Sequence, residues 1–314
     1  EDVNLMKLQE KLGEDFSEPN HRKICRPFGE NIGMSLGESA QFVILMADSL
    51  ALELGLNIHG AALSSHIHAD GYKKSISGPG AGNYLTVGKV FSEIKKHFGE
   101  DAMHKTFFHA HGTSTPQNRE SESHIISSIS KAFGIKSLPV TAIKSYLGHS
   151  LAAAGGDQMI SSLGSWRNNL IPGIASTPKL ADNVYTENVN FLLENLEFEN
   201  NDFDFAVLNA KGFGGNNGTA LLASPSKTLQ LLQSKYSKDQ IKKYHSQKES
   251  VDEQLLENKN RILKGDIQSR YIFGENVIDG INNFQVESHQ ITNKLNDEKF
   301  DLQSTLPYQE FFIT

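Results

Sequence analysis

Two histidines and a lysine are the residues whose types and spacing best suit catalysis. His111 lies in the segment 109–116, which reads HAHGTSTP, and Lys144 and His149 lie in the segment 144–149, which reads KSYLGH. Each segment directly follows a short apolar run that is typical of a buried strand. Imidazole can move a proton or stabilise an anion, and a nearby lysine adds positive charge. The pattern therefore predicts an acid/base and anion-stabilising site.

A third segment, 209–217, reads NAKGFGGNN and has the same form as the first two. All three consist of a strand, a polar or glycine turn, and small residues that let another chain segment come close. Glycines let the backbone turn sharply or approach a ligand. In open α/β sheets, side chains just past the strand ends line the ligand crevice. We therefore expect the three segments to converge on one crevice.

The elements that must position these segments are predicted by hydrophobic periodicity in residues 1–225. Apolar runs rich in β-branched and aromatic residues predict strands at 41–46, 58–63, 106–109, 138–143, 205–208 and 219–223. Amphipathic stretches predict helices at 48–54, 84–98, 120–133 and 152–167. This alternation indicates an α/β fold with helices layered on a sheet.

Composition excludes several classes of function. The 314 residues are 38% hydrophobic, which is enough for one large core or a core plus an appendage. The net charge of −7 and the absence of a strongly basic stretch argue against nucleic acid as a partner. The longest apolar run, 42–47, is too short to span a membrane, and from the polar residues 1–4 we expect no signal peptide. A single cysteine, Cys25, excludes an internal disulfide and fits a reducing cytoplasm.

The composition changes at residues 224–226, where we place a boundary between segments 1–225 and 226–314. The second segment is rich in Lys, Gln, Glu, Asn and Asp, and it predicts helices at 227–236 and 251–263. We expect a mixed helical and irregular extension on the outside of the α/β body, away from His111 and His149. A disordered tail is the alternative, although terminal aromatic residues argue against it. These are Tyr308, Phe311 and Phe312.

Taken together, the three segments resemble the β-ketoacyl synthase family. The strings HGTSTP at 111–116, KSYLGH at 144–149 and GFGG at 212–215 have the family's order and approximate spacing, within a resemblance from about Arg26 to Ala223. The resemblance implies a thiolase-like fold of two similar α/β halves, usually in a homodimer, with this chain as the C-terminal half. It also implies a decarboxylative Claisen condensation in fatty acid or polyketide elongation. An acyl chain is held on a cysteine, a malonyl group on an acyl carrier protein loses CO2, and the enolate attacks the acyl thioester.

The resemblance assigns the chemical step to three residues. His111 and His149 would donate hydrogen bonds to the nascent enolate oxygen, where negative charge develops. Lys144 would hold the local geometry and field, through a carboxylate partner for which Glu122 is the candidate. We expect residues 118–122 to start a helix that brings Glu122 near Lys144.

The resemblance assigns substrate positioning to five further residues. The Phe213 backbone N–H would form one half of the oxyanion hole for the acyl thioester. Gly212 and Gly214 would let the backbone approach that carbonyl without a Cβ clash. Thr113 and Thr115 would hydrogen-bond the amides of the phosphopantetheine arm of the carrier protein. No other cofactor is implied, and no metal.

The family's nucleophilic cysteine is not found in this sequence. Cys25 precedes Arg26-Pro27-Phe28, where the family tolerates Ser or Cys without a catalytic role. We therefore expect this chain alone to form no acyl-enzyme, and its site to be completed by an N-terminal half that carries the cysteine. The sequence also departs from the family at Arg119, where an Asp is usual, and at Lys211, where an aromatic or small residue is usual.

Two alternative functions remain open from the sequence. One is a non-catalytic partner of the same fold, similar to a chain-length factor, although such partners typically lose the histidines. The other is a scaffold module whose tail binds neighbouring synthase domains. A separate question concerns His66, His68 and Asp70, which fall on one face of an extended strand and have the spacing of metal ligands. Without further ligands nearby, a polar wall of the substrate channel is the favoured interpretation.

Overall fold

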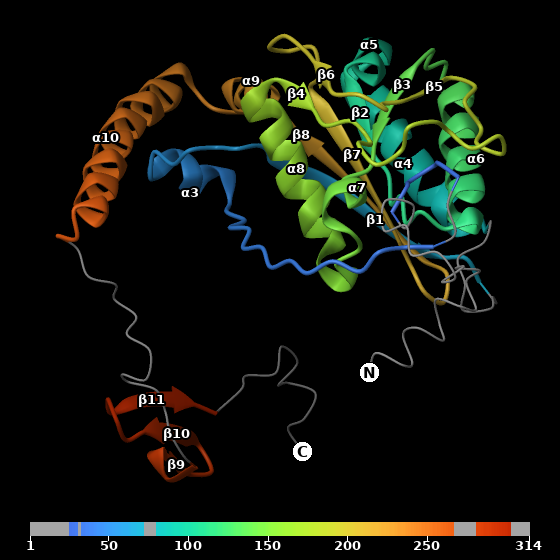
Figure 1. The fold of residues 1–314 in the computed structure, drawn as a ribbon. Coiled ribbons are helices and arrows are strands. Elements are labelled where there is room, and N and C mark those ends of the chain that lie inside the picture. The colour runs from blue at the N-terminus through green and yellow to red at the C-terminus, as the bar shows by residue number, and fades with distance from the viewer. Residues whose placement is uncertain (1–24, 31–32, 72–79, 267–280, 303–314) are drawn as a thin grey trace, which may run out of the picture. The chain divides into compact units, whose positions relative to one another are not determined.

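The computed structural model describes residues 25–30, 33–71, 80–266 and 281–302 (Figure 1). The chain divides into two compact units, Glu1–Val251 and Asp252–Thr314. The first unit therefore extends past the compositional boundary that we place at residue 225. No helix in the described residues is both long and apolar enough to cross a membrane.

A six-stranded sheet forms the centre of the first unit. Its strand order is β1-β8-β7-β2-β3-β5, and the strands β7, β2, β3 and β5 run parallel. Strand β8 pairs antiparallel with both β7 and β1, so that β1 forms one edge. In sheet order the strands are Ala61–Ala69, Asn216–Ala223, Phe205–Gly212, Thr106–His109, Leu138–Thr141 and Val189–Phe191. A separate two-stranded sheet pairs β4 (Leu170–Ile171) with β6 (Leu196–Glu197).

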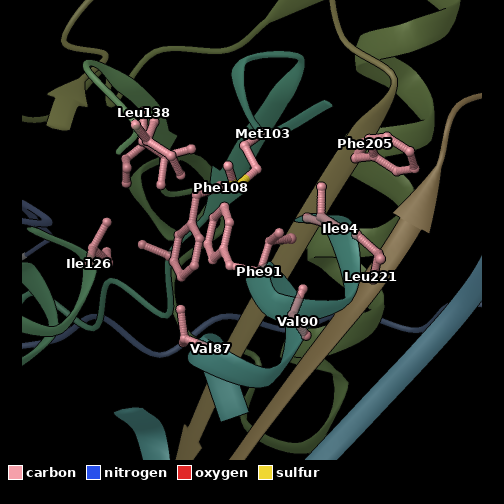
Figure 2. Close-up of a cluster of buried hydrophobic side chains, with 14 of the residues drawn as sticks. Val87, Val90, Phe91, Ile94, Met103, Phe108, Ile126, Leu138, Phe205 and Leu221 are labelled. Carbon is pink, nitrogen blue, oxygen red and sulfur yellow. The ribbon is translucent and has the colours of Figure 1, made fainter. Parts of the chain in front are cut away.

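Helices cover both faces of this sheet. Helices α4 (Ala81–Phe98) and α6 (Pro116–Ala132) share one hydrophobic core with the sheet, and α8 (Ala154–Asn168) contributes to a second core on the other face. Figure 2 shows the first core, where Val87, Val90 and Phe91 of α4 meet Phe108 of β2. All four residues of β2 are buried, the polar Thr106 and His109 as well as Phe107 and Phe108, because helices cover both faces of the strand.

Short elements connect the sheet to the predicted site. Helix α5 (Glu100–His104) precedes β2, α7 (Lys144–Leu147) follows β3, and a 3-10 turn at Leu151–Ala153 leads into α8. These bounds place residues 110–116 and 142–149 after the carboxyl ends of β2 and β3, whereas the third segment spans the end of β7, the turn 213–215 and the start of β8.

The first part of the C-terminal extension packs on the outside of the α/β body. Helix α9 (Pro225–Lys235) begins at the Ser224 cap, whose hydroxyl accepts a hydrogen bond from the Lys227 N–H at 3.1 Å. Helix α10 (Lys238–Leu263) follows it, and the two pack against α3 (Asp48–Glu53). This contact is a third hydrophobic cluster with four buried residues, Leu52, Leu232, Ile241 and Tyr244.

The second unit contains a small antiparallel sheet of its own. Strands β9 (Phe284–Val286), β10 (Gln290–Asn293) and β11 (Glu298–Asp301) pair in the order β11-β10-β9, after a 3-10 turn at Ile281–Asn283. The expected mixed extension thus includes a described strand region that we did not predict. The terminal aromatic residues of the chain lie outside the described residues.

Most predicted strands and helices are confirmed, and the strand predicted at 41–46 is wrong. Those residues belong to no strand, and Phe42, Ile44 and Leu45 are 95%, 86% and 75% exposed. A strand needs a neighbour whose backbone groups it can pair with, which an apolar run does not by itself reveal. The strand predicted at 58–63 is shifted to Ala61–Ala69, and the helix predicted at 251–263 is the end of the longer α10.

Candidate active site

A tight turn after β2 places His111. Gly112 has φ +52°, and a Cβ built on it would lie 2.7 Å from the Cβ of Ala142. Only glycine fits this left-handed and crowded position without strain. The turn leaves the N–H groups of His111 and Gly112 side by side, and both donate to the carboxylate of Glu122, at 2.7 and 2.9 Å.

Glu122 is a fully buried carboxylate that anchors the histidine turn. The predicted helix exists as α6 but begins at Pro116, ahead of the start that we expect at 118–122, and it carries Glu122 beneath the turn. Besides the two backbone N–H groups, Glu122 accepts hydrogen bonds from the side-chain amides of Asn118 at 2.9 Å and Asn209 at 2.7 Å. The carboxylate therefore has four donors, which compensates for its removal from water.

The prediction that Glu122 forms an ion pair with Lys144 is wrong. Lys144 Nζ instead donates to the backbone oxygen of His111 at 2.6 Å and lies 3.5 Å from His111 Nδ1. Burial lowers the pKa of Lys144 to about 8, and the charge of Glu122, acting from farther away, raises it again in part. The reason for the different arrangement is that backbone N–H groups of the turn occupy the Glu122 oxygens.

His149 is held by a segment far away in the sequence. Its N–H donates to the Ser35 oxygen at 2.7 Å, and its own oxygen accepts from the Gly37 N–H at 3.0 Å. A Cβ on Gly37 would lie 1.9 Å from the Leu147 oxygen, so glycine is required for this approach. The His149 ring is fixed by the Leu151 N–H, which donates to Nδ1 at 3.1 Å.

The two imidazoles face each other as neutral hydrogen-bond donors. Their ring centroids lie 5.2 Å apart, with the ring planes at 85°. Burial, together with the positive charge of Lys144, lowers the pKa of His149 to about 4 and that of His111 well below its ordinary value. Each Nδ1 lies beside a donor, the Lys144 ammonium or the Leu151 N–H, which assigns the proton of each ring to Nε2.

A pocket of about 310 Å³ joins most of the predicted site residues. Six of them line it, namely His111, His149, Thr113, Thr115, Gly212 and Phe213. Thr113 and Thr115 stand together, with their hydroxyl oxygens 3.2 Å apart. Lys144 lies behind His111 and does not line the pocket, and neither does Gly214. No described residue of the extension lines it.

Sequence reasoning missed residues that support or line the pocket. Asn209 joins Glu122 to Asn83 of α4, and the Gln158 amide donates to the backbone oxygens of Ala110 and Asn209, at 2.9 Å in both cases. Asn209 is the polar first residue of the third segment, so its position at the end of a predicted strand could have identified it as a site residue. Nothing in the sequence of α8 distinguishes Gln158 in this way. The further lining residues are Met34, Asn118, Leu151, Ala152 and Lys211.

Cys25 lies beside the site without joining it. Its thiol donates to the Lys144 oxygen at 2.9 Å, and the Ser114 hydroxyl lies 3.7 Å from Sγ. Among the described contacts it has no hydrogen bond with either imidazole, and it does not line the pocket. Burial raises the pKa of the Cys25 thiol, the opposite of what activates a nucleophilic cysteine.

His66 and His68 face helix α4 instead of a common ligand. His66 Nε2 lies 2.8 Å from the Glu93 carboxylate, and His68 Nε2 lies 2.7 Å from Lys89 Nζ. The Asp70 carboxylate accepts the Gly82 N–H at 2.9 Å. Within the described residues, no group of three or more His, Cys, Asp or Glu side chains has the arrangement of a metal site. The two histidines do not line the pocket, so they are not part of its wall.

A sheet with helices on both faces and two imidazoles at the carboxyl ends of its parallel strands is the arrangement of the thiolase-like fold. The family described as "Beta-ketoacyl synthase, C-terminal domain" matches residues 60–177. The β-ketoacyl-(acyl-carrier-protein) synthase FabY of Pseudomonas aeruginosa is 41% identical over 283 residues, which are 90% of this chain and 44% of FabY. The 3-oxoacyl-(acyl-carrier-protein) synthase 2 of Vibrio cholerae is 26% identical over 202 residues, which are 64% of this chain and 47% of that enzyme.

Solved structures agree with these relatives. The crystal structure of FabY from P. aeruginosa has a TM-score of 0.76 at 39% identity, covering 92% of this chain and 45% of FabY. A β-ketoacyl synthase from Burkholderia phymatum shares the fold, with a TM-score of 0.56 over 71% of this chain and 52% of that one. The chain belongs to the β-ketoacyl synthase family and spans about half the length of the relatives it matches.

Proposed function

We propose that this chain supplies the decarboxylating part of a β-ketoacyl synthase, which condenses a malonyl group on an acyl carrier protein with an acyl thioester. The observation that carries the proposal is the pair of neutral imidazoles, His111 and His149, over one pocket. When the malonyl thioester loses CO2, the electron pair of the broken C–C bond moves onto the thioester oxygen as an enolate. Two Nε2–H groups near this oxygen stabilise the developing charge.

The surroundings of the imidazoles support this role. Burial and the Lys144 ammonium keep both rings neutral, so each retains an acceptor at Nδ1 for its support and a donor at Nε2 for the substrate. Thr113 and Thr115 offer hydroxyl groups to the amides of a phosphopantetheine arm from the pocket wall. No other cofactor enters the proposal. The Phe213 N–H would contribute to the oxyanion hole of the acyl thioester.

The nucleophilic cysteine belongs, in this proposal, to an N-terminal half of the family type. Support comes from a strip of exposed large hydrophobic side chains, Phe42, Ile44 and Leu45, which a further part of the enzyme would cover. The synthases that this chain resembles are also about twice its length. A homodimer, an acyl carrier protein as partner, and the cytoplasm as location complete the proposal.

Decarboxylation can be tested on this chain without the cysteine, because forming the enolate needs only the donors. Incubation with a malonyl-carrier thioester should release CO2 and leave the acetyl-carrier thioester, with a solvent proton replacing the lost carboxylate. Mass spectrometry of the carrier measures the conversion. We expect H111A and H149A to abolish it, while H124A, an exposed histidine of α6, leaves it unchanged. Conversion no faster than in buffer, or equal in all variants, would contradict the proposal and favour a non-catalytic subunit.

A further inference from the structure

Lys211 is a buried cation at the pocket that the proposed mechanism does not use. It is the seventh residue of β7 and only 6% exposed. Along a strand, alternate side chains point to the same face, so Lys211 shares its face with Asn209, which contacts α4 and α6. In agreement, Lys211 Nζ donates to the Ser121 hydroxyl of α6 at 3.2 Å.

Lys211 brings an amine group to the pocket. The other described residues that line it carry imidazole, apolar, hydroxyl or amide groups. Burial is the main cause of the lowered pKa of His111, and Lys211 is among the charges that lower it further. The ammonium therefore acts within electrostatic range of the imidazole that faces the substrate. A charge in such a partly dry site interacts more strongly than one in water.

We propose that Lys211 is a specificity-determining residue, which binds the free carboxylate of the malonyl thioester and so selects it over neutral acyl thioesters. The inference rests on the proposed function and deepens it. The carboxylate is the one charged group of the acyl part of that substrate, and it leaves as neutral CO2. The interaction with Lys211 therefore exists in the bound ground state and ends on decarboxylation, so that it contributes to binding and discrimination and not to the rate of the chemical step.

The test measures binding to this chain of two stable pantetheine amides that carry no phosphate. The first probe carries a malonyl group and the second an acetyl group. In both, the acyl group is attached through nitrogen in place of sulfur. Isothermal titration calorimetry should show that the wild type binds the malonyl amide about tenfold more tightly, as expected for one charge-assisted contact in a partly solvated site. K211M should bind both amides equally, and K211R should keep most of the preference.

Controls separate this proposal from its alternatives. K131M removes an exposed lysine of α6, the helix that Lys211 contacts through Ser121, and should keep the wild-type preference because Lys131 pairs with Glu187 instead. A thermal melt of K211M verifies that it folds, and K211R tests the charge if it does not. Equal binding of both amides by the wild type would overturn the Lys211 assignment alone, and binding of neither would overturn the proposed function with it.

A third probe distinguishes the carboxylate from a phosphate as the anion. It is the acetyl amide of 4′-phosphopantetheine, in which the phosphate is the anionic group. We expect K211M to bind this probe as the wild type does. A loss of about tenfold or more in K211M would assign Lys211 to the phosphate of the arm and overturn its assignment to the malonyl carboxylate.

Discussion

Replacing Glu122 with glutamine should destabilise the protein far more than the loss of one charge on its surface would. Each oxygen of Glu122 accepts two hydrogen bonds, one from a backbone N–H of the histidine turn and one from an asparagine side chain. Glutamine keeps one acceptor oxygen and turns the other into an NH2 group that faces two donors. E122Q therefore loses two charge-assisted bonds in either orientation of its amide.

The magnitude follows from these two bonds. At about 1.5–3 kcal/mol each, and after some relaxation of the turn, their loss lowers the free energy of unfolding by about 3–5 kcal/mol. Domains of this kind have a total of about 5–15 kcal/mol, so E122Q should remain folded but with a much lower urea midpoint. The same loss frees the backbone of His111, which is expected to abolish malonyl decarboxylation.

The assay is urea unfolding followed by the fluorescence of Trp166, the single tryptophan of the chain. It reports on the core of the first unit because it is nearly buried and donates to the Phe203 oxygen at 2.9 Å. E120Q is the matched control, with the same substitution at an exposed position of the same helix, and should change the free energy by less than about 0.5 kcal/mol. An E122Q protein within 1 kcal/mol of the wild type would refute the reasoning.

Three further predictions concern a buried histidine, a glycine turn and the single cysteine. Burial lowers the pKa of His109 to about 3 from 6.5, so the unfolded chain binds a proton there first, and stability should fall as the pH decreases from 6.5 towards 3. Urea unfolding at pH 6.5 and 4.5 measures how steeply the free energy of unfolding falls with pH. H109L should make this fall smaller by up to about 1.4 kcal/mol per pH unit. An equal fall in H109L and the wild type would contradict the lowered pKa of His109. G134A, at φ +73° with free space, should cost about 1 kcal/mol, whereas G112A, which also clashes, should cost about 3 kcal/mol; equal costs would argue against the clash. Cys25 should show no acyl mass shift after incubation with an acyl-carrier thioester, and an acyl-Cys25 peptide would make this chain a complete enzyme.

The sequence alone predicted the parts of the fold that local patterns control. Strand β2 was predicted with its observed bounds, Thr106–His109, because it is a short run rich in β-branched and aromatic residues, the types that favour strands. Helix α4 was predicted to begin at residue 84 and begins at Ala81. Helix ends are commonly uncertain by a few residues, here next to a glycine-rich loop. The predicted strand at 41–46 failed because strand formation depends on a partner supplied by the rest of the chain.

For the site, residue types and positions after strands determined which side chains could meet. His111, His149, Thr113 and Thr115 were all predicted and all line one pocket, since the carboxyl ends of neighbouring parallel strands share one edge of the sheet. In the sequence, Lys211 differs from the aromatic or small residue usual in the family, and nothing more marks it. Its place in the pocket wall became visible only in three dimensions.

Which partner each polar group takes was decided only by the tertiary structure. Glu122 and Lys144 are opposite charges near one site, and the sequence gives no reason for them to avoid an ion pair. In the folded protein both serve the backbone of His111, the carboxylate through N–H groups of the turn and the ammonium through its oxygen. The physical reason is that buried backbone groups must be satisfied, and a tight turn exposes groups that no helix or strand can pair. Sequence spacing determines which residues reach the crevice, and the unpaired groups of the turn determine what those residues do there.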